Sequence, residues 1–272
     1  MEAAHGASPQ GLDVSGQRAG PVPAHACRAF GLAGGDLDIR LDDANRPAAV
    51  TRLLASCLDG FADREAAETR VWEWTLAERL QGLLAIVIAS SAAGPPWQTR
   101  CERCEAAIEM DVPLDAFVET PRDGPIVCQS PDGHAITARQ PRGSDLRAWL
   151  MRAGDAETMA TMLVEAIDGG APAADWRTPL AWIGPLADAL AESDPLTTLQ
   201  LQAGCPACGH ANLIDFDLEG WLLGLVADEQ QHLIDDVHRL ASVYHWSEAT
   251  ICALPHWRRR AYLMRIERET AA

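Results

Sequence analysis

Two stretches of this chain, CERCEAAIEMDVPLDAFV from Cys101 to Val118 and CPACGHANLIDFDLEGWL from Cys205 to Leu222, repeat each other 104 positions apart. Aligned without a gap, they agree at both cysteines of a CxxC pair, and the agreement continues downstream at Ala107/Ala211, Asp111/Asp215 and Leu114/Leu218. Alternating apolar and polar residues follow the first pair, as in a short strand. The chain therefore carries one structural unit twice, and we call each CxxC turn with its outgoing strand a knuckle.

The paired cysteines predict a metal site. Two thiolates in one CxxC turn can hold a metal ion, and a second pair completes the tetrahedral four-cysteine shell that zinc favours in structural sites. We therefore predict one structural Zn²⁺ bound by Cys101, Cys104, Cys205 and Cys208. Such a shell is closed, because catalysis by a metal requires a position that no protein ligand fills.

Several alternatives stay open for these cysteines. A CxxC pair also occurs in thioredoxin-type redox proteins, although no βαβ pattern surrounds either pair here. Four free cysteines could share this spacing by chance, and a separation of about 100 residues is wide for a compact zinc ribbon. His210 could replace one cysteine in the shell. The second knuckle has Gly209 after its last cysteine, as such turns prefer, whereas the first has Glu105.

Composition limits the class of protein. The 272 residues are 48% hydrophobic, which is enough for a substantial core, and the formal net charge is −17. All 22 basic residues are arginine. This acidity argues against general nucleic-acid binding, because neutralising phosphates requires a basic surface. The sequence has no secretory signal pattern and no apolar stretch long enough for a membrane span, so we expect an intracellular protein with mostly reduced cysteines.

Hydrophobic periodicity predicts an α+β fold that is mostly helical, with a zinc-ribbon-like β element formed by the two distant knuckles. Thr75 and Glu78 form a capping-box pattern ahead of a segment that is apolar all round at 83–89, which predicts a buried central helix. Helices are also expected at 45–61, 145–153, 156–167, 180–192, 218–246, 248–253 and from 255 onward. A short strand is expected at 36–41, and a hairpin from 126–128 and 135–138.

Three parts of the chain are expected. Residues 1–35, rich in Gly, Ala and Pro, read as a disordered or loosely attached arm. Residues 36–215 form a mixed α/β region that contains the first knuckle and an intervening helical part. Residues 216–272 form a C-terminal helical segment that follows the second knuckle. The isolated cysteines are expected to be small buried residues: Cys27, Cys57, Cys128 and Cys252.

The C-terminal segment differs in charge from the rest of the chain, because residues 256–269 (HWRRRAYLMRIERE) hold five Arg against two Glu. Trp, Tyr and Arg dominate the residues that contribute most to protein–protein binding. We therefore expect partner contacts at Tyr244, Trp246, Trp257, Arg258, Arg259 and Arg260. Tyr244 and Trp246 fit equally well as core residues that hold the last helices to the long one. A possible set of metal ligands is formed by Asp235, Asp236 and His238, but a solvated helix face is the simpler interpretation of these residues.

The stretch VHRLASVYHWSEATICALPHWRRRAYL, Val237 to Leu263, resembles the C-terminal signature of the phage-type (T4-like) baseplate hub assembly protein family of contractile tails and related contractile injection systems. The matching features are His238-x-Leu240-Ala241, the block 244–248, Leu254, the arginines 258–260 and Tyr262-Leu263. Upstream, the order of Arg139-x-Pro141, Asp194-Pro195, the CPxCG of 205–209 and the acidic residues of 215–217 also resembles the family. The resemblance covers about residues 40–266, but Glu105 departs from the usual glycine.

The resemblance implies a role in building a contractile-tail baseplate, with baseplate or hub proteins of a contractile particle as partners. The sequence shows no catalytic set, so we expect a non-enzymatic assembly or structural protein, and its acidity argues against nucleic acid as a partner. The resemblance also implies that the protein is located in the cytoplasm of a bacterial cell. It does not decide whether the protein is incorporated into the assembled particle as a permanent component or acts as a transient assembly chaperone. Two other classes remain as alternatives: a zinc-ribbon nucleic-acid-binding module, and a zinc-dependent hydrolase, whose metal would have three protein ligands and a water.

Overall fold

The structure is a computed structural model that describes residues 27–41, 45–90, 96–118, 122, 124–152 and 154–270. It is an α+β protein, as predicted. Its helices are α1 (Arg46–Cys57), α2 (Arg64–Trp72), α3 (Leu76–Ala89), α4 (Gly143–Arg152), α5 (Ala156–Leu163), α6 (Leu180–Ser193), α7 (Leu218–Tyr244), α8 (Glu248–Cys252) and α9 (His256–Thr270), with 3-10 helices η2 (Gly34–Asp36), η3 (Leu114–Phe117) and η4 (Pro195–Thr198). Its strands are β1 (Trp97–Arg100), β2 (Ala107–Met110), β3 (Ile126–Gln129), β4 (Ala135–Ala138), β5 (Val164–Ile167), β6 (Gln200–Gly204) and β7 (Ala211–Asp215).

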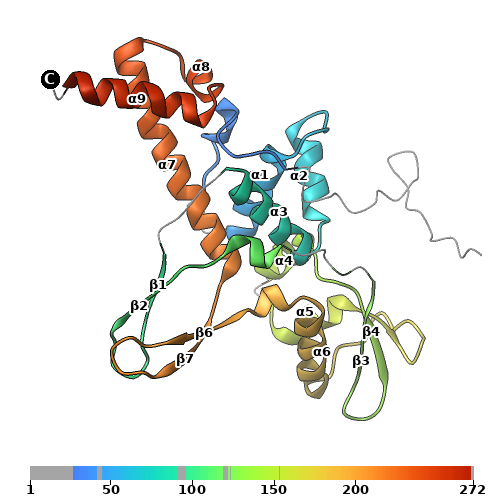
Figure 1. Ribbon diagram of the computed structural model, residues 1–272. Coiled ribbons are helices and arrows are strands. Elements are labelled where there is room, and N and C mark those ends of the chain that lie inside the picture. Colours follow the sequence, from blue (N-terminus) through green and yellow to red (C-terminus); the bar gives the residue numbers. More distant parts are fainter. Residues whose placement is uncertain are drawn as a thin grey trace, which may run out of the picture.

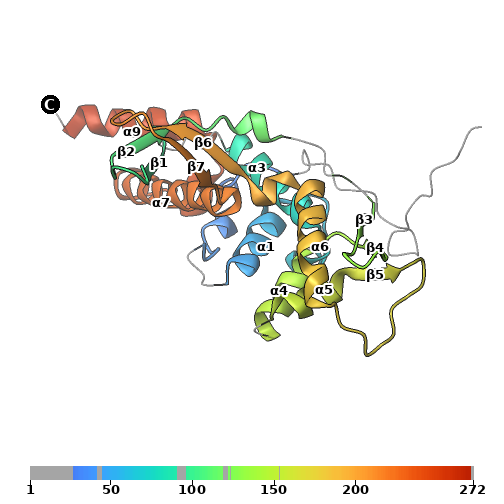
Figure 2. The same ribbon diagram turned by 90° about the horizontal axis from the view of Figure 1, so that it is seen from below.

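These elements form three separate parts around a helical centre (Figure 1). The β1–β2 and β6–β7 hairpins lie side by side at one end of the molecule, and the antiparallel sheet β3–β4–β5 lies with α5 and α6 at the other. Figure 2 shows the same separation from below. The long helix α7 leads from the hairpins to α8 and α9. Among the described residues, no helix is both long and apolar enough to cross a membrane.

The central core is built around α3, and it confirms the buried helix predicted at 83–89. Thr75 and Glu78 cap each other reciprocally at the start of α3, so the helix begins where the sequence pattern places it. Its side chains are buried on nearly every side, including Leu83 and Ile86. The helices α1 and α2 and the first half of α7 pack into the same core. Phe30 also belongs to it, whereas residues 1–26 of the expected arm lie outside the described residues.

Two buried charged residues stabilise this core, and the sequence pattern missed both. The strand expected at 36–41 is wrong: Asp36 ends η2 and is fully buried. Its carboxylate accepts two hydrogen bonds from Arg28, at 2.7 and 2.8 Å, and one from Ser56. These bonds hold the backbone in a turn, which outweighs a short apolar–polar alternation. Arg79 is also fully buried and donates to Thr51 and to the carbonyl oxygens of Val71 and Pro47.

A second core lies between β3–β4–β5 and the helices α5 and α6, where Trp182 and Leu186 are buried. The hairpin predicted from 126–128 and 135–138 is confirmed as β3 and β4. The helix predicted at 156–167 is wrong in its last turn, because α5 ends at Leu163 and β5 follows directly. Pairing of β5 with β4 satisfies the backbone there, and local periodicity carries no information about such a partner.

Candidate metal centre

The repeat in the sequence is a repeat in the structure. The hairpins β1–β2 and β6–β7 each close on a six-residue loop, 101–106 and 205–210. In the first loop, the N–H of Cys101 donates to Ala106 O at 2.9 Å and the N–H of Glu105 to Cys101 O at 2.9 Å. In the second, Cys205 donates to His210 O at 2.8 Å and Gly209 to Cys205 O at 3.0 Å. The two knuckles therefore share one hydrogen-bond pattern.

Both knuckles also require a left-handed residue at the same place, directly after the second cysteine. Glu105 has a φ of 58° and Gly209 a φ of 70°. Glycine adopts this region readily, whereas for other L-residues the Cβ crowds the backbone. The sequence comparison identified Glu105 as the weaker residue for this turn, and the structure gives the reason: the turn is kept and the glutamate is strained.

The turns bring the four cysteines of the two knuckles together. The Sγ atoms of Cys101 and Cys208 lie 3.8 Å apart, those of Cys104 and Cys205 lie 3.6 Å apart, and all four lie within 4.8 Å of one another. A tetrahedral ion with metal–sulfur bonds of about 2.3 Å requires sulfurs about 3.8 Å apart. A disulfide would require about 2.05 Å. The four sulfurs are therefore spaced to hold one metal ion.

Backbone amides prepare the thiols for this role. Burial opposes ionisation of Cys101, but N–H groups of Arg103 and Cys104 and the neighbouring thiols lower its pKa to about 6. The pKa of Cys205 is also lowered, chiefly by the N–H of Cys208. The N–H of His210 favours the Cys208 thiolate, but the neighbouring Cys104 thiol, burial and the two other thiols outweigh it and raise the pKa of Cys208 to about 12. Without a metal the cluster therefore keeps some protons, and a metal cation would displace them.

A buried amide joins the two knuckles. Asn212 Oδ1 accepts a hydrogen bond of 3.0 Å from the N–H of Glu102 in the other knuckle. Its Nδ2 donates to Ala203 O and His210 O. In the aligned repeat, Asn212 stands opposite Ile108, and this break in the apolar match is the signal in the sequence for the cross-link. Asn212 fixes how the two turns face each other.

The hairpins are fastened to the central core by aromatic side chains. Phe216, directly after β7, contacts the edge of Trp97 at 5.1 Å between ring centroids and packs against Trp221 at 5.5 Å. The repeat then continues into helix in both copies, because η3 follows the first knuckle and α7 the second. The cysteine cluster is thus connected through both hairpins to the body of the protein.

Among the described residues, the four cysteines are the one group spaced to hold a metal. His210 is not in that group, and neither are Asp235, Asp236 and His238 on α7. Of the isolated cysteines, three are buried and Cys128 is partly buried. Burial raises the pKa of all four, to about 11 for Cys27 and about 12 for Cys57, with a nearby carboxylate adding to the shift in both. Such thiols react poorly, in line with a packing role.

The residues expected to contact a partner divide into two groups. Tyr244 and Trp246 stack at 4.8 Å and both contact Tyr262, against a small core of Leu240, Ile251 and Leu263, which is the packing role considered for them. Arg259 is only 4% exposed and reaches toward Gly31 O, so it lies inside the protein. Trp257 is 69% exposed, and Arg258 and Arg260 are exposed beside it on α9.

The donor set narrows the identity of the metal. A tetrahedral shell of four thiolates is typical of zinc or of iron–sulfur centres, whereas magnesium and calcium prefer oxygen ligands. Cys101 and Cys205 are buried and Cys104 and Cys208 exposed, so the cluster has one side open to solvent. No family model, no curated protein and no solved structure matches this chain.

Proposed function

We propose that the four cysteines hold one structural Zn²⁺ and that the two hairpins around it form a zinc-ribbon-like element. The observation that carries this proposal is the spacing of the sulfurs, 3.6 and 3.8 Å in the two cross-knuckle pairs. Four thiolates fill a tetrahedral shell, which favours a structural role over the three-ligand site of a hydrolase. The metal would supply a cross-link: it closes a loop of about 100 residues, for which chain entropy predicts a stabilisation of about 4–5 kcal/mol.

Metal analysis of the purified full chain tests this part. We expect about one zinc and no iron per chain by elemental mass spectrometry, and loss of the metal together with a lower unfolding temperature in Cys101→Ser/Cys205→Ser. The matched control is Cys128→Ser, which removes a thiol outside the cluster and should retain the zinc. A well-folded wild-type chain without zinc would contradict the proposal, and iron in its place would change the metal but keep the clamp.

We further propose that the chain is a non-enzymatic assembly or structural protein of a phage-like contractile tail baseplate. Support comes from the resemblance of Val237–Leu263 to the baseplate hub assembly family. The exposed Trp257 with Arg258 and Arg260 on α9 adds physical support, because a tryptophan exposed beside arginines is typical of residues that dominate protein interfaces. Arg259 is excluded from this surface by its burial.

Binding to candidate partners tests the assembly function. Baseplate, sheath, tube and spike proteins encoded near this chain should be purified and titrated against it by calorimetry. We expect one of them to bind, and Trp257→Ala to weaken that binding at least tenfold. The control is Met151→Ala, another highly exposed apolar residue, but on α4. Absence of binding to all of them, with salt-sensitive binding to DNA instead, would favour a nucleic-acid-binding module.

A further inference from the structure

The four cysteines form two close pairs, each of which crosses from one knuckle to the other. The Sγ atoms of Cys101 and Cys208 lie 3.8 Å apart. Those of Cys104 and Cys205 lie 3.6 Å apart. Each pair joins an exposed residue, Cys208 or Cys104, to a buried one. Because oxidation of a thiol depends on access, an oxidant in solution reaches the exposed member of each pair first, and a buried cysteine of the other knuckle lies beside it.

This arrangement suits the two steps by which a peroxide joins two thiols. In the first step, the exposed thiolate forms an S–O bond, the O–O bond of the peroxide breaks, and the departing hydroxide takes up a proton to leave as water. In the second step, the buried thiolate attacks the sulfenic acid, an S–S bond forms, and the S–OH oxygen leaves as a second water. Each pair gives two electrons to one peroxide, so the cluster consumes two peroxides and yields two disulfides.

The structure favours disulfides across the knuckles over disulfides within one CxxC turn. A disulfide requires sulfurs about 2.05 Å apart, so each sulfur of a cross-knuckle pair has to move by only about 1 Å. Within the first turn, the N–H of Arg103 donates to Cys101 Sγ at 3.4 Å and holds that sulfur in place. The bond from the N–H of Glu102 to Asn212 Oδ1 keeps the two turns facing each other without help from a metal. The cross-knuckle pairs are therefore ready to close.

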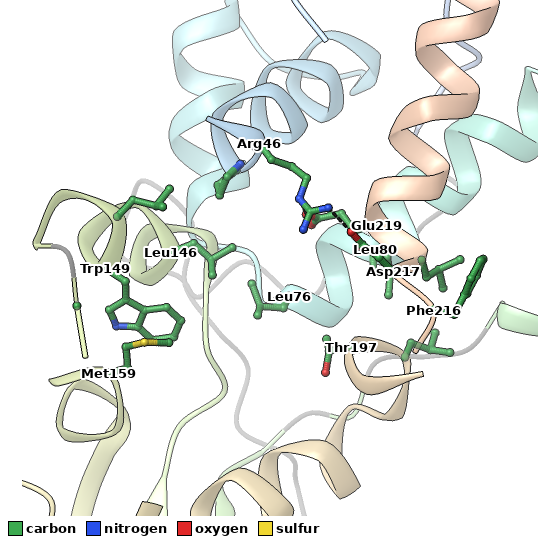
Figure 3. Close-up of a pocket in the computed structure, with 15 residues that line it drawn as sticks. Arg46, Leu76, Leu80, Leu146, Trp149, Met159, Thr197, Phe216, Asp217 and Glu219 are labelled. Atoms are coloured by element: carbon green, nitrogen blue, oxygen red, sulfur yellow. Dashed lines mark hydrogen bonds and ion pairs between the residues drawn. The ribbon is translucent and has the colours of Figure 1, made fainter. Parts of the chain in front are cut away.

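A link between the knuckles matters because of what lies between them in the chain. Every member of the second core lies within residues 126–190, between the two CxxC pairs. This part meets the central helices along an incompletely packed seam, where a pocket of about 680 Å³ separates Trp149 and Met159 on one side from Leu80 of α3 on the other (Figure 3). Walls that do not touch gain no packing energy from each other. A cross-link at the knuckles therefore holds the two sides of the seam together.

We propose that the cysteine cluster is also a modification site, at which a peroxide exchanges the metal for two disulfides, Cys101–Cys208 and Cys104–Cys205. Oxidation releases the metal, because only the thiolate is a metal ligand. The disulfides join positions 107 and 101 residues apart, so they close nearly the same loop that the metal closes. The inference rests on the proposed zinc site and adds its regulation: oxidation changes the metal content while the knuckles stay joined.

Hydrogen peroxide, added in small excess to the full, zinc-containing chain, tests the pairing. We expect release of the zinc to a colorimetric chelator, loss of four of the eight thiols, and both cross-knuckle disulfides in mass spectrometry of an unreduced tryptic digest. Trypsin cuts after Arg103, so a disulfide within the first turn gives different peptides from one across the knuckles.

The outcomes separate this inference from the zinc site itself. Disulfides within the turns, sulfinic or sulfonic acids without disulfides, or zinc and thiols that peroxide leaves unchanged would each overturn the inference, although the zinc site would stand. A chain that holds no zinc before peroxide is added would contradict the proposed function instead.

Single variants assign the pairs. Cys104→Ser should form only the disulfide Cys101–Cys208, and Cys208→Ser only Cys104–Cys205. The matched control, Cys128→Ser, removes a thiol outside the cluster and should form both. Any other pairing in the two cluster variants would refute the assignment. The peptide map of the wild-type chain decides the pairing even where a variant does not fold.

The fold of the two metal-free forms tests whether the disulfides replace the metal. One sample is oxidised with peroxide, and the other is stripped with a chelator in the presence of a reductant. We expect the reduced form to unfold several degrees lower and to exchange the backbone amides of α4 and η4, which line the pocket, faster than the oxidised form. Equal unfolding temperatures and equal exchange would show that the disulfides do not hold the seam, against the proposal.

Discussion

The unequal residues after the two CxxC pairs lead to a prediction with opposite signs in the two knuckles. Glu105 and Gly209 occupy equivalent left-handed positions, at φ 58° and 70°. A residue with a Cβ in this region strains the folded state by about 1–2 kcal/mol. Glycine avoids that strain, but its greater conformational freedom in the unfolded chain lowers the stability of the fold by about 0.5–1 kcal/mol. Glu105→Gly should therefore stabilise the first knuckle by about 0.5–1 kcal/mol, and Gly209→Ala should destabilise the second by a similar amount.

Zinc affinity is the direct measure, because the free energy of folding a structural metal site is part of its metal-binding free energy. The difference corresponds to about two- to fivefold tighter zinc binding in Glu105→Gly and about two- to fivefold weaker binding in Gly209→Ala. Competition with a chelator of known affinity resolves such factors. No atom lies within 4 Å of a Cβ built on Gly209, so the effect in this variant comes from the backbone alone.

Gly204→Ala provides the matched control. Gly204 ends β6 in the same hairpin, its Cβ would also meet no atom within 4 Å, and its φ is outside the left-handed region. Zinc affinity in this variant should stay within about twofold of wild type, since alanine is if anything favoured in a strand. Weaker zinc binding in Glu105→Gly, or an effect of Gly204→Ala equal to that of Gly209→Ala, would refute the reasoning from backbone strain.

Three further predictions concern buried polar groups and the metal. Burial would raise the pKa of Asp36, but hydrogen bonds from Arg28 and Ser56 lower it, so its contribution to stability is present above the unfolded pKa of about 4 and is lost as pH falls through the folded pKa. Asp36→Asn should therefore cost about 2–3 kcal/mol in urea unfolding at pH 7 and much less at pH 2. An equal loss at both pH values would contradict the ion-pair explanation. Asn212→Leu should cost about 1–3 kcal/mol, because it leaves the N–H of Glu102 without its partner, and an unchanged unfolding midpoint would show that water replaces the amide. Zinc binding to the metal-free chain should release protons and weaken as pH falls, because the pKa of Cys208 is raised to about 12 and its thiol must lose a proton to bind the metal. Calorimetry in buffers of different ionisation enthalpy would count the released protons. A count of zero would contradict zinc binding by the thiol cluster.

The features that could be predicted from the sequence are those set by neighbours along the chain. The capping box at Thr75 and Glu78, the buried character of α3 and the hairpin of β3 and β4 all follow from local patterns, and all are present. The cysteine repeat predicted a grouping across 104 positions, because a CxxC turn is incomplete without a partner pair. The structure brings the four sulfurs together as expected.

The missed features depend on partners that are distant in sequence. Asp36 fits the local alternation of a strand, but its hydrogen-bond partners Arg28 and Ser56, eight and twenty residues away, hold it in a turn. Arg79 has the helical spacing of an ordinary surface residue, yet Thr51 and two carbonyl oxygens hold it inside the core. Arg259 lies within a basic run for which partner contacts were expected, but its side chain is buried inside the protein. Composition and periodicity average over such residues, and only packing distinguishes them.

The length of α7 gives the molecule the properties of a lever. The helix has 27 residues, so it spans about 40 Å from Asp217, next to the β6–β7 hairpin, to Tyr244, which packs against α9. A tilt of about 10° at its first turn would displace the far end by about 7 Å. Because the first half of α7 is packed into the central core, that core sets the direction of the lever, and a small repacking around Leu222 and Leu225 would displace the exposed Trp257 without altering a single residue near that tip.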